Sequence, residues 1–483
     1  MLNFVINILL NIKDESFKYL NVVHFMCEQL KLILMKKINY SSELIVFSSL
    51  LYYSSPKSYY FLKSFGNLIL PSNSTVRRLT YIMKSSPEIE QSDVYFLHYI
   101  KEKFRFLNPN DKIVTLMIDE IHMKKYFDYK GGTIVGAGYN TDEAASSAFV
   151  FMLNSLKSSF KDVVHILPVK TITAEALYQF IHKIVVGLEN IGFMVICIVT
   201  DNNAINSKAM SSFVNPPKVS FVYPHPSNTD RPLFFLFDSV HIFKCVRNNW
   251  LNQKNTEKNM IFPNFDLNCK YKNFTSICKA PFTTLYELHK LEINHVLKYS
   301  YKLSLKALYP SNFERQNVKL VMQIFNDYVS TSLKTLGDKN NLTNSKDVAL
   351  FIDIITRWWE IMNVKTPFKG QRLNNNYQYP LTCDFGDIKI IFLNYFLDWL
   401  DKWNEMKNVC GKLSKQTFNA LQHTTNGIIQ LSDYCMNELK FDYILPGKFQ
   451  TDCLEDRFGQ YRQLAGSQYN IYALDKFLSV KKN

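Results

Sequence analysis

The stretch Lys112-Ile113-Val114-Thr115-Leu116-Met117-Ile118-Asp119-Glu120 places a short apolar run directly before two carboxylates. Five of the six residues from Ile113 to Ile118 are apolar, which is typical of a strand buried on both faces. A carboxylate at the end of such a strand lies at the rim of a sheet, where ligands and metals bind. Taken alone, the pattern also fits a strand followed by a polar turn, so the rest of the chain decides between the two.

Length and composition narrow the class of protein. The chain has 483 residues, enough for about two to four structural units. A hydrophobic content of 47% favours a folded globular protein. The formal charge of +14 favours a polyanionic partner, and nucleic acid is favoured over a membrane because the basic residues are spread along the chain and no lipidation signal is present. A basic surface without such a partner is the alternative.

Targeting signals and cysteines indicate the cellular compartment of the protein. No window reaches the ~18–20 uninterrupted apolar residues of a membrane span. The apolar segment 1–10 lacks a basic start and a small-residue cleavage site, which argues against a signal peptide. The nine cysteines are scattered and form no CxxC pair, as expected for free thiols in the cytosol or nucleus. A nucleic-acid partner favours the nucleus.

The N-terminal part is expected to be helical. Leu20, Val23, Cys27, Leu30 and Leu34 follow a 3-4-3-4 spacing, so segment 1–37 is either a short coiled coil that makes a homo-oligomer or an ordinary packed helix.

Three further helices are predicted within residues 38–90, with breaks near Pro56 and Gly66. The third opens with serines and two arginines, which is compatible with helix-turn-helix DNA binding. We therefore expect a helix-turn-helix-like domain that contacts DNA through Ser74, Arg77 and Arg78.

Residues 105–250 show an α/β pattern. The predicted strands and the one intervening helix cover 113–119, 133–139, 148–153, 173–188 (helix), 192–201 and 233–237. Three consecutive strands, a helix and further strands are close to the order of a ribonuclease-H-like sheet. The strand 192–201 ends in Asp201, a second carboxylate at the end of an apolar run.

The chain then becomes mainly helical. Helices are predicted at 282–299, 315–334, 346–362 and 388–406, all within a domain of residues 251–435. The final segment, 436–483, contains an amphipathic helix at 452–462 that carries Glu455.

Asp119, Asp201 and Glu455 suit metal-dependent phosphodiester chemistry. Two Mg²⁺ or Mn²⁺ ions ~3.5–4 Å apart stabilise the attacking and leaving oxygens, and such cations bind carboxylates from rigid elements. A metal-bound water gives hydrolysis, whereas a DNA 3′-hydroxyl gives strand transfer. The chain contains no GxSxG, GxxxxGK[ST], HExxH or strand-linked GxGxxG motif. His122 and His241 could orient a group, although ordinary hydrogen bonding is the commoner role.

The same stretches resemble the P-element transposases, a family that includes animal proteins joining a THAP zinc-binding domain to this catalytic core. The resemblance runs from about residue 40 to the C-terminus, and its stretches follow the order of the family: 70–79, 117–120, 149–152, 199–206, 237–248 and 452–462. The last resembles the family's D-x-L-E-N-x-F segment, in which Glu455 matches the catalytic glutamate.

The resemblance implies a ribonuclease-H-like catalytic core interrupted by a large, mostly helical insertion that binds GTP, after a small helical domain. An insertion would explain why 254 positions separate Asp201 from Glu455. The family's guanine-contacting segment resembles 351–363, where Glu360 stands in place of Asp and Asn363 matches. A plain amphipathic helix is the alternative for this segment.

The chain also departs from the family. No zinc module precedes the helical unit, Ser239 and Val240 replace more usual residues, and Asp456 replaces Asn. The expected function is a nuclear, homo-oligomeric DNA transposase that cuts transposon ends and joins them to target DNA with Mg²⁺ and GTP. Its expected phosphate contacts are Lys124, Lys125, Arg247 and Arg462. The alternatives are a domesticated or defective DNA-binding derivative without catalysis, and an unrelated nuclease of the same fold.

Overall fold

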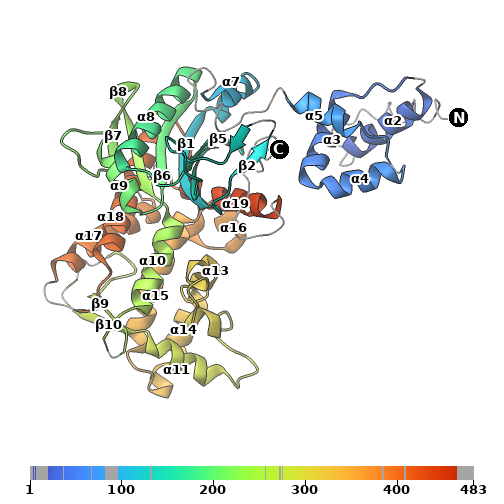
Figure 1. Ribbon diagram of the computed structural model, residues 1–483. Helices are drawn as coiled ribbons and strands as arrows, with labels where there is room; N and C mark the ends of the chain where they lie inside the picture. The colour runs from blue at the N-terminus through green and yellow to red at the C-terminus, as the bar shows by residue number, and fades with distance from the viewer. Residues whose placement is uncertain are drawn as a thin grey trace.

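Figure 1 shows the computed structural model of the protein, which describes residues 20–464 except 36, 67, 82–95, 131–132, 256, 271–273, 275, 383, 385 and 407–409, together with Phe4 and Ile6. The described residues form a small helical unit, a mixed sheet with its helices, and a mainly helical region. The predicted α/β class is therefore confirmed.

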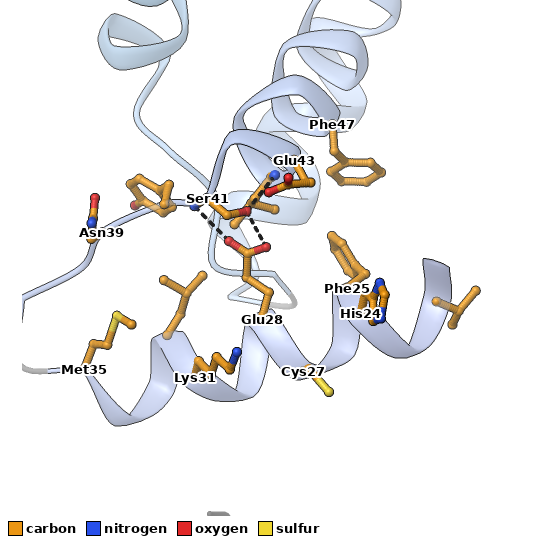
Figure 2. Close-up of a pocket in the computed structure, with 14 residues that line it drawn as sticks. His24, Phe25, Cys27, Glu28, Lys31, Met35, Asn39, Ser41, Glu43 and Phe47 are labelled. Atoms are coloured by element: carbon orange, nitrogen blue, oxygen red, sulfur yellow. Dashed lines mark hydrogen bonds between the residues drawn. The ribbon is translucent and has the colours of Figure 1, made fainter. Parts of the chain in front are cut away.

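The helical unit has a hydrophobic core of its own. It comprises α2 (Leu20–Leu34), α3 (Ser42–Ser54), α4 (Pro56–Ser64) and α5 (Asn73–Tyr81). Ser41 caps α3 by accepting a hydrogen bond from the Leu44 backbone (3.1 Å). Figure 2 shows α2 beside the start of α3, where the Glu28 carboxylate accepts hydrogen bonds from the backbone (2.9 Å) and hydroxyl (2.5 Å) of Ser41. The predicted helices are thus confirmed, whereas residues 14–19 lie outside the described part and the coiled-coil pairing stays a prediction.

A six-stranded mixed sheet lies at the centre of the fold, in the order β5-β4-β1-β6-β8-β7. Its strands are β1 (Ile113–His122), β4 (Ser147–Ser155), β5 (Lys161–Val169), β6 (Met194–Thr200), β7 (Val222–His225) and β8 (Asn228–Phe237). Three strands, β1, β6 and β8, run parallel, and the others pair antiparallel with their neighbours. The parallel strands therefore end at one edge of the sheet.

One strand prediction was wrong, and the sheet strands β5 and β7 were not predicted. Residues 133–139 form no strand of the sheet, because β3 (Thr133–Val135) pairs only with β2 (Asp128–Lys130) and Gly136 then takes a φ of +113° that turns the chain. The strand β5 contains Pro168, and its place at the edge of the sheet makes the missing N–H tolerable.

Helices cover both faces of the sheet in Figure 1. They are α7 (His98–Phe104), α8 (Ala174–Ile191), α9 (Ala204–Ser211), α10 (Ser239–Leu251), α18 (Lys415–Asn437) and α19 (Asp452–Leu464). As predicted, a helix covers the amphipathic stretch 173–188: α8 begins after its cap Thr173 and runs on to Ile191, where Gly192, at φ +115°, ends it. The helix α18 falls inside the predicted insertion, yet its Thr424 hydroxyl accepts a hydrogen bond from the Phe237 backbone of β8 (3.1 Å).

The helical region lies below the sheet in Figure 1. It contains β9 (Asn259–Pro263), β10 (Ile277–Pro281), α11 (Thr283–Glu292), α12 (Leu305–Leu308), α13 (Val318–Met322), α14 (Asp327–Leu336), α15 (Ser345–Met362), α16 (Lys369–Leu373) and α17 (Ile388–Glu405). Short 3₁₀ turns cover Pro109–Asp111, Glu314–Gln316, Asp338–Asn340, Asn376–Gln378 and Pro446–Phe449.

Two helices of this region are shorter than predicted: the first stops at Glu292, and the second is split into α13 and α14 where Asn326 caps α14. Trp358 of α15 donates a hydrogen bond to Thr425 of α18 (3.0 Å), so the region shares the core of the sheet. Among the described helices, none has the length and apolar character needed to span a membrane.

Candidate active site

Three parallel strands each deliver a carboxylate to the same edge of the sheet. Asp119 lies in β1 next to Ile118, which pairs with Thr200 of β6, and Asp201 follows Thr200 directly. Thr200 in turn pairs with the last residue of β8, and Asp238 follows that strand. Since adjacent strands lie about 4.8 Å apart, the three carboxylates are neighbours.

The helix α19 brings Glu455 to this edge. It packs against β1, where the Cys453 sulfur lies 3.2 Å from that of Met117, two residues before Asp119 and therefore on the same strand face. The start of α19 is fixed from the other side, because the Thr451 backbone donates a hydrogen bond to Asp238 (3.4 Å). The structure thus brings all three predicted catalytic carboxylates into one region, despite the long segment between Asp201 and Glu455.

Burial and neighbouring negative charge raise the pKa values of Asp119 and Asp201. Burial, followed by the charge of Asp201 and with smaller contributions from Glu455 and Asp238, raises the pKa of Asp119 to about 8, even though the Glu120 backbone donates a hydrogen bond to it (2.8 Å). Burial also raises the pKa of Asp201, against the opposing effects of His241 and of a hydrogen bond from Asn206 (2.5 Å). In the absence of a cation, Asp119 therefore keeps its proton at neutral pH.

Two further residues belong to the site although the sequence reasoning did not assign them. Asp238 is buried and caps α10 by accepting hydrogen bonds from the Val240 and His241 backbones (both 3.1 Å). Its burial raises its pKa, partly offset by the positive charge of Lys244. The Lys244 side chain is only 8% exposed, and its amine lies 3.5 Å from the half-exposed carboxylate of Glu455.

The oxygen donors at this edge suit a hard divalent cation such as Mg²⁺. Repulsion between the carboxylates supports the same view, since a cation would relieve it. Within the described residues, however, no three His, Cys, Asp or Glu side chains converge as a finished ligand set. The Glu455 carboxylate is paired with the Lys244 amine, so it would have to leave this amine before it could complete a set of metal ligands.

The expected DNA contacts have different surroundings. Lys124 and Lys125 are exposed just after β1, and Ser74, Arg77 and Arg78 are exposed on α5. Arg247, in contrast, is fully buried, and it donates a hydrogen bond to the Arg315 carbonyl (3.0 Å). Its burial gives it a structural role in place of the predicted phosphate contact.

The side chain of Arg462 lies outside the described part of the chain. The prediction that it contacts phosphate therefore has no structural counterpart here.

The segment expected to read guanine lies at the end of α15. Glu360 accepts hydrogen bonds on Oε1 from Asn375 (2.7 Å) and Gln378 (2.9 Å), and burial raises its pKa. Asn363 ends the helix, and its carbonyl accepts a hydrogen bond from Lys369 (2.6 Å). This segment is joined to the start of α19, because Gln450 donates a hydrogen bond to the Met362 carbonyl (3.0 Å).

Sequence comparisons agree with this architecture. The family described as "TNP-like, RNase H N-terminal domain" matches residues 93–214. The P transposase of the transposable element P from Drosophila melanogaster is 22% identical over 363 residues, 74% of this chain and 43% of the relative. The DNA transposase THAP9 of Homo sapiens is 22% identical over 229 residues, 44% of this chain and 24% of the relative. The matches thus span less than half the length of either relative.

A solved structure covers more of the chain. It is that of the Drosophila P element transposase strand transfer complex, which matches with a TM-score of 0.74 and 19% identity over 95% of both chains. The fold of this protein is therefore that of the P element transposase, with its RNase-H-like core, as the sequence resemblance predicted. Residues 93–214 match the TNP-like RNase H N-terminal domain, and the chain is similar in sequence and in fold to the P element transposase.

Proposed function

We propose that the protein is a DNA transposase that cleaves phosphodiester bonds at transposon ends and joins the released 3′-hydroxyl to target DNA. The observation that carries the proposal is the meeting of Asp119 and Asp201, each at the end of a parallel strand, with Glu455 of α19. Homology to a transposase, and the likeness to a structure named as a strand transfer complex, support the same activity.

Asp119, Asp201 and Glu455 would hold two Mg²⁺ or Mn²⁺ ions, which supply Lewis-acid stabilisation of the attacking and leaving oxygens when bound. Asp119 must lose its proton for this, because only the ionised carboxylate is a good ligand. Asp238 contributes by fixing the start of α10 and of α19, and hence the position of Glu455.

The proposal includes DNA and GTP as partners. The chain's charge of +14 favours DNA, and the exposed basic residues Lys124, Lys125, Arg77 and Arg78 are its proposed phosphate contacts. For GTP, the proposed guanine ligands are Glu360 and Asn363. The two amides that bind Glu360 both donate to Oε1, and the second carboxylate oxygen is an acceptor of the kind that the N–H groups of guanine require. A nuclear location and a homo-oligomeric state complete the proposal.

The test is cleavage and joining of labelled duplex oligonucleotides by the full chain with Mg²⁺ or Mn²⁺, with and without GTP. Asp119→Asn and Glu455→Gln should each lower the rate by about a thousandfold or more, whereas Asp142→Asn, an exposed carboxylate in the loop before β4, should not. Equal activity of the parent and the Asp119 variant would reject the assignment. DNA binding without cleavage by any of these proteins would favour the alternative, a DNA-binding derivative that lacks catalysis.

A further inference from the structure

A buried carboxylate clamps a surface loop in the helical region. Glu292, the last residue of α11, is 1% exposed and accepts hydrogen bonds from the backbones of Tyr299 (2.7 Å) and Ser300 (3.1 Å) and from the Ser300 hydroxyl. These bonds close residues 293–299, hereafter the Glu292 loop, into a compact surface loop whose base is held by a charged acceptor. The loop is therefore tied by hydrogen bonds to the helix that precedes it.

The Glu292 loop presents apolar side chains to water. Val296 is 99% exposed and Leu297 is 88% exposed, and Ile293 and Tyr299 are also more than half exposed. Neither of the two residues at the tip can contribute to the core. An exposed apolar cluster of this kind usually marks a surface that binds a partner.

The sequence that forms and follows the loop is basic, although two acidic side chains from outside it approach its lysines: Glu314 lies 3.9 Å from Lys306, and Asp327 interacts electrostatically with Lys302. From residue 293 to residue 313 the sequence has no Asp or Glu but contains Lys298, Lys302 and Lys306. The Lys302 amine lies 4.3 Å from the centre of the Tyr328 ring, and the exposed Tyr301 ring packs edge-on against the same ring (4.8 Å). The apolar tip is thus bordered by lysines and an accessible aromatic side chain.

We propose that the Glu292 loop, with Tyr301 and Lys302, is a DNA-binding surface. In this assignment the lysines contact phosphates, and Val296 and Leu297 pack against bases or enter a base step as an apolar wedge. The exposed Lys298 of the loop, together with Lys302, favours a polyanion, and the choice of DNA among polyanions rests on the proposed function. The loop follows α11 at the end of the helical region farthest from the sheet in Figure 1, so the DNA it contacts lies away from the acidic edge.

The experiment measures fluorescence anisotropy of the full chain with a fluorescein-labelled duplex and with a single strand of the same length. Val296→Ser combined with Leu297→Ser should weaken binding by about tenfold, since the variant loses the apolar surface that the two side chains bury against the bases. Lys298→Gln with Lys302→Gln should lower the slope of log affinity against log salt by about 1–2. The control is Ile277→Ser, an apolar residue of β10 in the same region that is 58% exposed; this variant should bind as the parent does.

Base unstacking gives a second readout. A duplex with a central 2-aminopurine should brighten when the parent binds and should not brighten with the Val296/Leu297 variant. The inference is overturned if that variant and Ile277→Ser bind DNA equally, or if the loop variant loses binding to anionic phospholipid vesicles and keeps binding to DNA. Failure of the proposed function would give a different result. If the protein binds DNA through the loop but does not cut it in the presence of Mg²⁺, the catalytic assignment is rejected and the DNA-binding surface is retained.

Discussion

The acidic edge of the sheet and the end of α15 both contain carboxylates that are largely buried, but the two regions differ in the groups that stabilise the negative charge. At α15, Glu360 accepts hydrogen bonds from the amides of Asn375 and Gln378, so the carboxylate is solvated by the protein itself. At the sheet edge, Asp119 and Asp201 lie beside other carboxylates, and the nearly buried cation Lys244 interacts with Glu455 and Asp238. The first arrangement is stable without added charge, whereas the second is suited to bind more cations.

The largest expected effect is a loss of stability of the metal-free protein as the pH rises. Asp119 has a pKa of about 8 when folded and about 3.8 when unfolded, so between these values the folded state binds more protons. The free energy of unfolding should therefore fall as the pH rises through this window, by on the order of 2 kcal/mol for this group. Thermal unfolding between about pH 5 and about pH 8, in the presence of EDTA, measures it.

The matched variant for this prediction is Asp119→Asn, which cannot ionise and should lose much less stability over the same range. His423, whose pKa is lowered to about 4 by burial, acts in the opposite sense, and the difference between parent and variant removes its contribution. Parallel pH profiles for the two proteins would mean that Asp119 ionises normally and that the edge is not crowded with charge.

A smaller effect is expected from Lys244. Replacing it with Gln removes the cation nearest Glu455, so the metal-free protein should be less stable and Mn²⁺ should bind more tightly. Loss of one adjacent positive charge is expected to lower the Mn²⁺ dissociation constant by about tenfold. Titration calorimetry of the full chain measures the binding, and Asp119→Asn identifies the heat that belongs to this site.

Lys389 offers a close control for Lys244. It is also 8% exposed and lies 2.8 Å from a buried carboxylate, that of Asp387, at the start of α17. Lys389→Gln should lower the unfolding temperature and leave Mn²⁺ affinity unchanged. If Lys244→Gln behaves the same way, or weakens Mn²⁺ binding, then Lys244 is only a structural ion pair.

The sequence could reveal Asp119 and Asp201 because their signal is local. Each follows a run of apolar residues that can only be a buried strand, and parallel strands meet at one edge. Asp238 carries the same signal after Phe237 and could have been assigned by the same argument. Glu455 was a candidate only as an acid near the start of a late helix, and the family resemblance matched it to the catalytic glutamate, since nothing local distinguishes a glutamate on an amphipathic helix.

The burial of Lys244 and Arg247 could not be predicted in this way. Both are basic residues on one helix, and basic residues are expected to be exposed to solvent when only the sequence is known. Only the packing of α10 against elements distant in the chain buries them, with the Arg315 carbonyl as partner of Arg247. The same limit applies to β5, whose edge position makes Pro168 acceptable but is set by the strand order of the whole sheet.

The smallest expected effect concerns Glu360, where the protein already supplies hydrogen bonds. Glu360→Gln keeps the size of the side chain but turns one acceptor into a donor, which would repel the N–H groups of guanine. GTP affinity should fall by about fivefold, in line with the net value of about one hydrogen bond. Equilibrium binding of a fluorescent GTP analogue, competed with unlabelled GTP or ATP, measures both the affinity and the base preference.

A matched control for this variant is Glu287→Gln on α11, an exposed glutamate outside the α15 segment. It should leave both GTP affinity and the preference over ATP unchanged. If Glu360→Gln also leaves both unchanged, the contacts with Asn375 and Gln378 are the whole role of Glu360, and the two carboxylate regions differ completely: one would bind a ligand and the other would only stabilise the end of α15.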